Sequence, residues 1–131
     1  CVGDLAVRME SFYRDIDPTW SCLKPAGPTG GAGAGSEQVL LRLEACIECG
    51  SCVSACPASR SHPDFMGPAA LAAIRNEMLK SPSAADDLLS RAGSERGERW
   101  CERALACSRV CPTGVYPARH IADLRRKLKE R

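Results

Sequence analysis

The chain has 131 residues, a length that suits one domain with an arm or linker beside it. Its formal charge of +2 argues against a nucleic-acid-binding protein, and no apolar run approaches the roughly 20 residues that a transmembrane helix needs. It contains only two each of Trp, Tyr and Phe but nine Cys, so we expect the cysteines to help hold together a core of small side chains.

The first 36 residues predict an arm and a linker rather than part of a packed domain. Residues 1–26 contain an Asp-Pro break, and we expect them to form an extended docking arm whose apolar side chains have little to bury against within the chain. Those side chains are Leu5, Val7, Met9 and Phe12. Residues 27–36 (GPTGGAGAGS) have the composition of a flexible linker. Residues 37–131 are then expected to form the main domain.

Helical signals dominate the main domain, and strand signals are almost absent. Proline favours the first position of a helix, because the N–H that it lacks would be unbonded there. The pattern predicts helices over 36–45, 67–80, 81–93, 94–106 and 117–129. The inward-facing residues are expected to be Leu71, Ile74 and Met78 in one helix and Ile121, Leu124 and Leu128 in another. The predicted fold class is therefore mostly α.

The first cysteine run reads C-x2-C-x2-C-x3-C-P and comprises Cys46, Cys49, Cys52 and Cys56. This spacing is the bacterial ferredoxin signature, in which the fourth cysteine ligates the other of two iron–sulfur clusters. Gly50 has no Cβ, so it allows the backbone to pass close to the inorganic sulfides. The run therefore predicts ligands for two clusters.

The second run comprises Cys101, Cys107 and Cys111 and follows the same template, except that Ala104 occupies the position of its second cysteine. If the runs exchange their last cysteines, one cluster has four thiolates and the other has three. A cubane that lacks its fourth thiolate can lose one iron, so we expect one 4Fe–4S and one 3Fe–4S cluster. The expected 4Fe–4S ligands are Cys46, Cys49, Cys52 and Cys111. The expected 3Fe–4S ligands are Cys56, Cys101 and Cys107.

Other uses of cysteine fit the pattern less well. Zinc prefers sets of four Cys or His ligands, and two runs with Cys-Pro endings and an odd number of cysteines fit that badly. A disulfide framework would favour an even number of cysteines in a small secreted chain. Cys1 and Cys22 lie outside both runs and are expected to be ordinary thiols. A structural metal module without electron transfer stays as an alternative.

Both runs and their surroundings resemble the C-terminal domain of the iron–sulfur subunit of succinate dehydrogenase and fumarate reductase. The resemblance covers nearly the whole chain and rests on DLAV and Phe12-Tyr13 near the start, then on CIECGSCVSACP, HPDFMGPAAL and CERALACSRVCPTGVYPARHI. It implies an alpha-helical ferredoxin-like domain that relays electrons from a flavoprotein subunit to membrane quinone, beside membrane anchor subunits. Succinate chemistry would belong to the flavin partner, since this chain has no acid–base constellation of its own.

The resemblance also implies a quinone site, which is altered in this chain. Pro57 matches the family, whereas Ser61 stands in place of its usual tryptophan and Glu102 in place of its usual histidine. Arg125 lies where the family often has a basic residue near quinone, with a solvated surface charge as the alternative.

Two histidines and a basic run complete the candidate residues. His62 lies in the same loop as Ser61 and is a candidate polar contact to quinone, whereas His120 is expected at the surface. The basic run over 125–131 is expected to be a solvated helix face, with anionic lipid headgroups as a second interpretation.

The family carries a 2Fe–2S cluster on a C-x4-C-x2-C pattern, which this sequence does not contain. We therefore expect that cluster on a separate chain or on a domain trimmed from this one. The first residue is not Met, and Ala and Arg are abundant, which fits an imported protein on the matrix side of the mitochondrial inner membrane. The cytoplasmic face of a bacterial inner membrane is the alternative.

Succinate dehydrogenase (respiratory complex II) is the leading interpretation, and fumarate reductase is the first alternative. A heterodisulfide-reductase or glycerol-phosphate-dehydrogenase type of complex is a further alternative. Those relatives usually complete the second run with a cysteine, so Ala104 argues against them.

Overall fold

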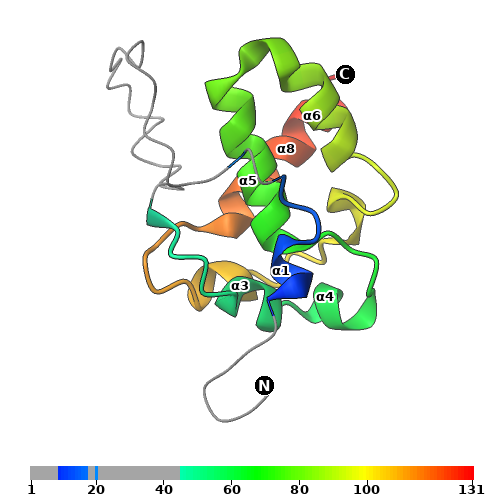
Figure 1. Ribbon diagram of the computed structural model, residues 1–131. Helices are drawn as coiled ribbons and strands as arrows, with labels where there is room; N and C mark the ends of the chain where they lie inside the picture. The colour runs from blue at the N-terminus through cyan, green and yellow to red at the C-terminus, as the bar shows by residue number, and fades with distance from the viewer. Residues whose placement is uncertain (1–8, 18–19, 21–44) are drawn as a thin grey trace.

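The computed structural model describes residues 9–17, 20 and 45–131. Within these ranges the regular structure is helical and no strand occurs, as Figure 1 shows. The α-helices are α1 (Glu10–Tyr13), α3 (Ser51–Ser54), α4 (Pro57–Ser61), α5 (Gly67–Lys80), α6 (Ala85–Ala92), α7 (Ala106–Arg109) and α8 (Pro117–Lys129). Within the described ranges, η3 (Pro82–Ala84) and η4 (Glu98–Trp100) are 3-10 helices. The prediction of a mostly α fold is confirmed for the described residues.

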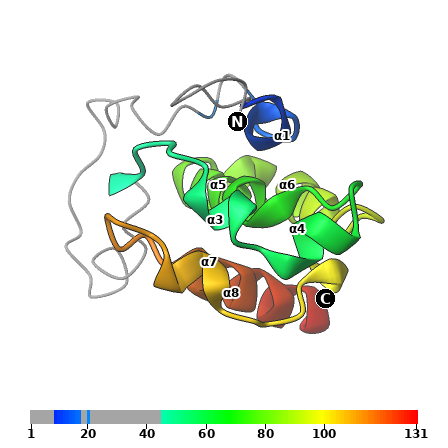
Figure 2. The same ribbon diagram turned by 90° about the horizontal axis from the view of Figure 1, so that it is seen from below.

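Helix α5 is the central element and contacts α8, α6, α3 and α1. Seen from below, α1 lies on one side of α5 while α7 and α8 lie on the other (Figure 2). The side chains of Leu71 and Ile74 on α5 and of Leu124 on α8 are completely buried. The core therefore sits between α5 and α8, with α6 packed against both.

The two long helices, α5 and α8, have the predicted bounds. Each has a proline near its first position, where no intrahelical hydrogen bond is lost. The predicted inward residues Met78 and Ile121 are buried, and Leu128 packs against the same core. The helix predicted over 81–93 is present as η3 followed by α6.

The prediction of a helix over 94–106 is wrong. After α6 the chain turns at Gly97, passes through η4 and then follows an irregular loop to α7. Gly97 packs so tightly that a Cβ there would lie 1.9 Å from the carbonyl oxygen of Ala92. Arg103 and Leu105 both have a φ of 58°, a left-handed conformation that a right-handed helix excludes.

Several predictions concern residues outside the described ranges. They cover the linker over 27–36, most of the helix over 36–45, and the side chains of Leu5, Val7, Cys1 and Cys22. The bounds of the arm, the linker and the main domain therefore stay predictions.

The segment over 9–17 packs against the helical domain. Phe12 is only 4% exposed, and its helix contacts α5. Asp15 is also buried, and Arg96 donates a hydrogen bond to its carboxylate at 3.0 Å. Arg14 donates to two carbonyl oxygens in the loop before α5, each at 2.8 Å. The expectation that Phe12 has little to bury against within the chain is therefore wrong, because α5 provides the apolar surface.

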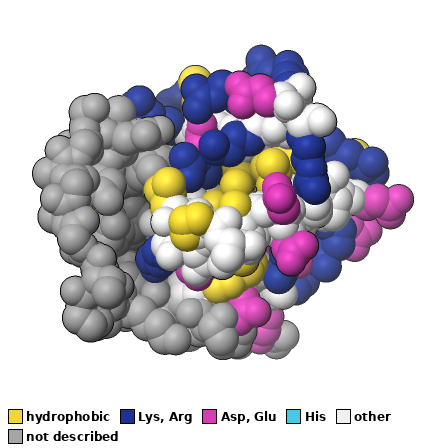
Figure 3. All heavy atoms as spheres, turned by 90° about the horizontal axis from the view of Figure 1, so that it is seen from above, with side chains coloured by type: hydrophobic (Ala, Val, Ile, Leu, Met, Phe, Trp, Pro, Cys, Tyr) yellow, Lys and Arg dark blue, Asp and Glu magenta, His cyan; other side chains and the backbone are white. Residues whose placement is uncertain are grey.

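Charges of both signs are interspersed on the surface. On the face shown in Figure 3, Lys and Arg side chains lie beside Asp and Glu, with hydrophobic side chains exposed between them. The basic residues in the last turn of α8 complement the negative end of its helix dipole. Among the helices of the described ranges, none is long and apolar enough to cross a membrane.

Substitution of two leucines on α5, one buried and one partly exposed, tests the position of the core. We expect Leu71→Ala to lower the free energy of unfolding by about 2–5 kcal/mol, because it leaves a cavity between the two long helices. Leu79→Ala removes the same atoms from a side chain that is 43% exposed, and should cost clearly less. Urea midpoints measured by circular dichroism under anaerobic conditions check this, and equal shifts for both variants would contradict the assigned core.

Candidate functional site

Two cavities divide the described cysteines between them. We call them the first cavity, of about 380 Å³, and the second cavity, of about 430 Å³. The first cavity is lined by the thiols of Cys46, Cys49, Cys52 and Cys111. The second cavity is lined by those of Cys56, Cys101 and Cys107. None of these seven thiols is in a disulfide. The structure thus brings together the same two sets of thiols that are expected if the two runs exchange their last cysteines.

The first cavity is bordered by a loop with two left-handed residues. Glu48 has a φ of 54° and Gly50 a φ of 71°, and Gly50 is the N-cap of α3. Within the described part of the chain, the backbone N–H groups of 47–50 donate no hydrogen bond to another backbone group. Left-handed and right-handed residues in succession turn N–H groups toward one side, an arrangement that binds anions and the sulfides of iron–sulfur clusters.

Cys111 reaches the first cavity from the second run, and its sulfur is hydrogen-bonded. The backbone N–H of Val115 donates to its Sγ at 3.3 Å, and Gly114 makes the turn with a φ of 68°. Burial alone would raise the pKa of the Cys111 thiol, but hydrogen bonds from the N–H groups of Val115, Thr113 and Gly114 outweigh it and lower this pKa. The thiolate, which is the form that binds iron, is therefore favoured here.

The pKa values of two other thiols, those of Cys52 and Cys107, are raised instead of lowered. Burial, followed by the nearby charges of Cys46 and Cys107, raises the pKa of the Cys52 thiol from 9.0 to about 12. Burial likewise raises the pKa of the Cys107 thiol. Cys52 on α3 and Cys107 on α7 line different cavities, and because α3 contacts α7 the two cavities adjoin. Thiols crowded in this way become thiolates when a bound cation supplies positive charge.

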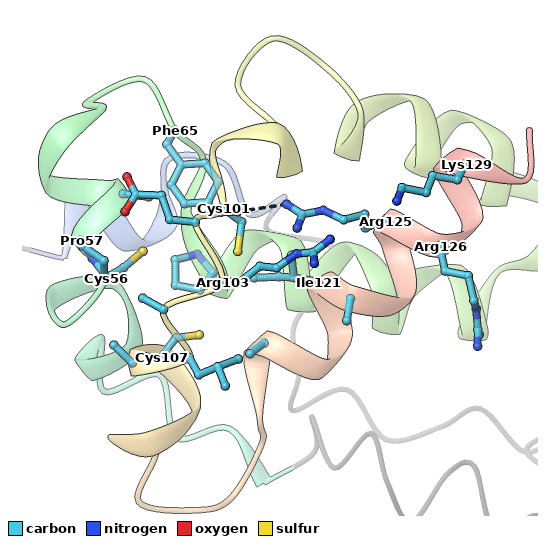
Figure 4. A pocket seen from close by; sticks show the side chains of 18 residues that line it. Cys56, Pro57, Phe65, Cys101, Arg103, Cys107, Ile121, Arg125, Arg126 and Lys129 are labelled. Atoms are coloured by element: carbon cyan, nitrogen blue, oxygen red, sulfur yellow. Dashed lines mark hydrogen bonds between the residues drawn. The ribbon is translucent and has the colours of Figure 1, made fainter.

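The second cavity lies between the start of α4, the loop before α7, and α8. Figure 4 shows the sulfurs of Cys56, Cys101 and Cys107 directed into one common space. Ala104 lines the same space and offers only a methyl group. In the described ranges, no backbone N–H of 102–105 donates to another backbone group, so these groups are available to an anion.

These features fit iron–sulfur clusters. The donor sets consist of thiols, and backbone N–H groups suited to sulfide border both cavities. Each volume is well above what one metal ion with its ligands at about 2.3 Å requires. Among the described residues, no group of three Cys, His, Asp or Glu could hold a single metal ion.

The residues expected to contact quinone do not all meet. Pro57, Glu102 and Arg125 line the second cavity. Ser61 is exposed at the end of α4, is not among the residues that line this cavity, and donates its hydroxyl to the carbonyl oxygen of Pro57 at 3.2 Å. His62 stacks against Trp100 instead, with ring centroids 4.0 Å apart.

Some relevant residues were missed by sequence reasoning. Glu98 pairs with Arg125, although 27 positions separate them and no local pattern connects them. Phe65 is buried and forms part of the wall of the second cavity. The expectation that His120 lies at the surface is wrong, because this residue is on the buried face of α8, with Ile121 and Leu124, and its side chain is completely buried.

Comparison with known proteins gives one family and several relatives. The family described as 4Fe-4S dicluster domain matches residues 42–115. The fumarate reductase iron-sulfur subunit of Wolinella succinogenes is 34% identical over 93 residues, covering 70% of this chain and 39% of the relative. The protein of the same name from Mycobacterium tuberculosis is 44% identical over 77 residues, covering 56% of this chain and 30% of the relative.

A mitochondrial relative aligns over more of the chain at lower identity. It is the succinate dehydrogenase [ubiquinone] iron-sulfur subunit 1 of Oryza sativa subsp. japonica, 28% identical over 134 residues, covering 95% of this chain and 47% of the relative. The chain thus spans less than half the length of these curated relatives.

Two cysteines of the first run test how the thiols are shared. We expect Cys56→Ala to abolish the EPR signal of an oxidised 3Fe–4S cluster and to leave that of a reduced 4Fe–4S cluster, because Cys56 lines the second cavity. Cys52→Ala, four positions earlier, should abolish the signal of the reduced 4Fe–4S cluster and leave that of the oxidised 3Fe–4S cluster, because Cys52 lines the first cavity. If Cys56→Ala removed the four-iron signal and spared the other, the two sets would be wrong.

Proposed function

Because the chain belongs to the 4Fe-4S dicluster domain family, as a C-terminal domain of the fumarate reductase and succinate dehydrogenase iron–sulfur subunit type, we propose that it relays electrons in a complex II-type enzyme. The observation that carries the proposal is the division of seven thiols into sets of four and three in two adjoining cavities. Two centres next to each other suit a relay, since electron tunnelling falls off steeply with distance.

We assign the 4Fe–4S cluster to the first cavity and the 3Fe–4S cluster to the second. Clusters of these kinds supply one-electron transfer when they are bound. The four thiols of the first cavity match a complete cubane. The second cavity has Ala104 where a fourth thiol would be, and this supports the three-iron form.

The chain's own residues hold the clusters and set their surroundings. Hydrogen bonds to a ligating sulfur, such as that from Val115 to Cys111, stabilise negative charge and raise the reduction potential. Apolar side chains such as Phe65 and Ile121 line the second cavity and limit the access of water. Succinate or fumarate chemistry would take place on a flavoprotein partner.

The assembly that we propose has further components. Electrons would pass between the flavoprotein, a 2Fe–2S centre on another domain or chain, this chain, and a quinone held with membrane anchor subunits. The chain would then be peripheral to the membrane, at the matrix side of the mitochondrial inner membrane or at the cytoplasmic face of a bacterial one. Pro57 and Glu102, on the wall of the second cavity, are the proposed quinone-side residues that its geometry supports best.

Both directions of the reaction are represented among the names of the relatives. Succinate oxidation stays our leading proposal, and fumarate reduction is the second candidate because fumarate reductase subunits are among the relatives.

Purification of the intact complex tests this function. We expect a flavoprotein and a 2Fe–2S centre to copurify with the chain, and succinate to reduce a soluble quinone analogue through the complex. Rates with succinate and with fumarate, measured on one preparation, decide the favoured direction. A complex that passes electrons between flavin and quinone without any 2Fe–2S centre would contradict the proposed relay, and so would a chain that binds zinc instead of iron.

A further inference from the structure

We propose that Arg125 is a positioning residue for the second cavity, which fixes the backbone of Cys101 and is itself anchored by Glu98. This role rests on the proposed function, because it takes Cys101 as a cluster ligand. It differs from the role that family resemblance suggests for Arg125, which is a direct contact to quinone.

The contacts of the Arg125 guanidinium carry the proposal. Nη2 donates to the carbonyl oxygen of Cys101 and to that of Glu98, each at 3.0 Å. Nε donates to the carboxylate of Glu98. Figure 4 shows the side chain reaching from α8 toward Cys101, whereas the neighbouring Arg126 points away from the cysteines. One arginine thus joins α8 to the residue at which the second cysteine run begins.

This ion pair is shielded from solvent. The side chain of Arg125 is 15% exposed and that of Glu98 is 14% exposed. Exposed ion pairs are worth little, but a shielded arginine with several acceptors holds a fixed geometry, because its donors form a rigid fork. The positive charge of Arg125 is also largely neutralised by Glu98, which leaves less of it for an acceptor inside the cavity.

The loop after Cys101 needs such support. Residues 102–105 lack backbone hydrogen bonds from their N–H groups to the rest of the described chain, and two of these residues have a φ of 58°. Arg109 holds the far side of the loop by donating to the carbonyl oxygen of Ala104 at 2.9 Å. Arg125 holds the near side, at the cysteine itself.

Helix α8 gives Arg125 a rigid base. Leu124, the preceding residue, is completely buried, and Ile121, one turn earlier, is 3% exposed. The helix therefore cannot shift without disturbing the core. Arg125 transmits this rigidity to the position of a thiol in the second cavity.

The test compares variants of the full chain in its complex. We expect Arg125→Gln to speed the release of iron from the second cluster to a chelator roughly 10- to 100-fold, the usual cost of losing a partner of a metal ligand. The midpoint potential of that cluster should shift as well. Arg125→Lys and Glu98→Ala, which each retain part of the contact set, should have the same effects to a smaller degree.

Two internal controls accompany the variants. The EPR signal and potential of the first cluster should stay at wild-type values in all of them, because Arg125 lies outside the first cavity. Lys127→Gln makes the same change of charge on α8 at a residue that does not line the second cavity, and should leave both clusters unchanged.

Three outcomes would overturn the proposal or its premise. If Arg125→Gln slowed quinone reduction while the second cluster kept its release rate and potential, Arg125 would be a quinone contact instead. Equal loss of both clusters in every variant would indicate that Arg125 stabilises the fold as a whole instead of positioning Cys101. Wild-type protein without a 3Fe–4S signal would overturn the proposed function itself.

Discussion

The two cavities take their thiols from the same two segments, and the segments exchange their last cysteines. Cys56 belongs to the first run but lines the second cavity, and Cys111 belongs to the second run but lines the first cavity. Neither set is complete until the two runs lie side by side, as the contact of α3 with α7 shows. Helices α5 and α8 supply the frame, since α3 packs on α5 and α7 packs on α8. This exchange makes the two cavities close neighbours, which is what the proposed relay requires.

The loops beside the two cavities both contain residues with a left-handed backbone conformation. Glu48 and Gly50 beside the first cavity, and Arg103 and Leu105 beside the second, have left-handed backbone angles that no regular helix contains. In the three non-glycine residues such angles cost conformational energy that the surrounding structure must offset, and residues of this kind recur at functional sites. Here they leave N–H groups without backbone partners in the described ranges, where an anionic cluster would accept them. The hydrogen bond from Arg125 to the carbonyl oxygen of Cys101 fixes the start of the second of these loops.

The sequence allowed the long helices and the grouping of thiols to be predicted, but not the loops between them. Proline starts and a periodic apolar face define α5 and α8 without help from distant residues. The helix over 94–106 failed because tertiary packing at Gly97 and the left-handed residues override propensity. Glu98 was missed because its partner is distant in the sequence. The assignment of ligands and of quinone residues stays a prediction, although the cavities support the first.

Mössbauer spectroscopy of the 57Fe-labelled complex is the sharpest test of whether the seven thiols hold one four-iron and one three-iron cluster, because it distinguishes and quantifies cluster types without relying on activity. We expect one 4Fe–4S and one 3Fe–4S component from this chain in equal amounts. In the variant Ala104→Cys, which adds a fourth thiol to the second cavity, the three-iron component should give way to a second four-iron component. A wild-type chain that holds two 4Fe–4S clusters, or only one cluster, would contradict the division of seven thiols into sets of four and three.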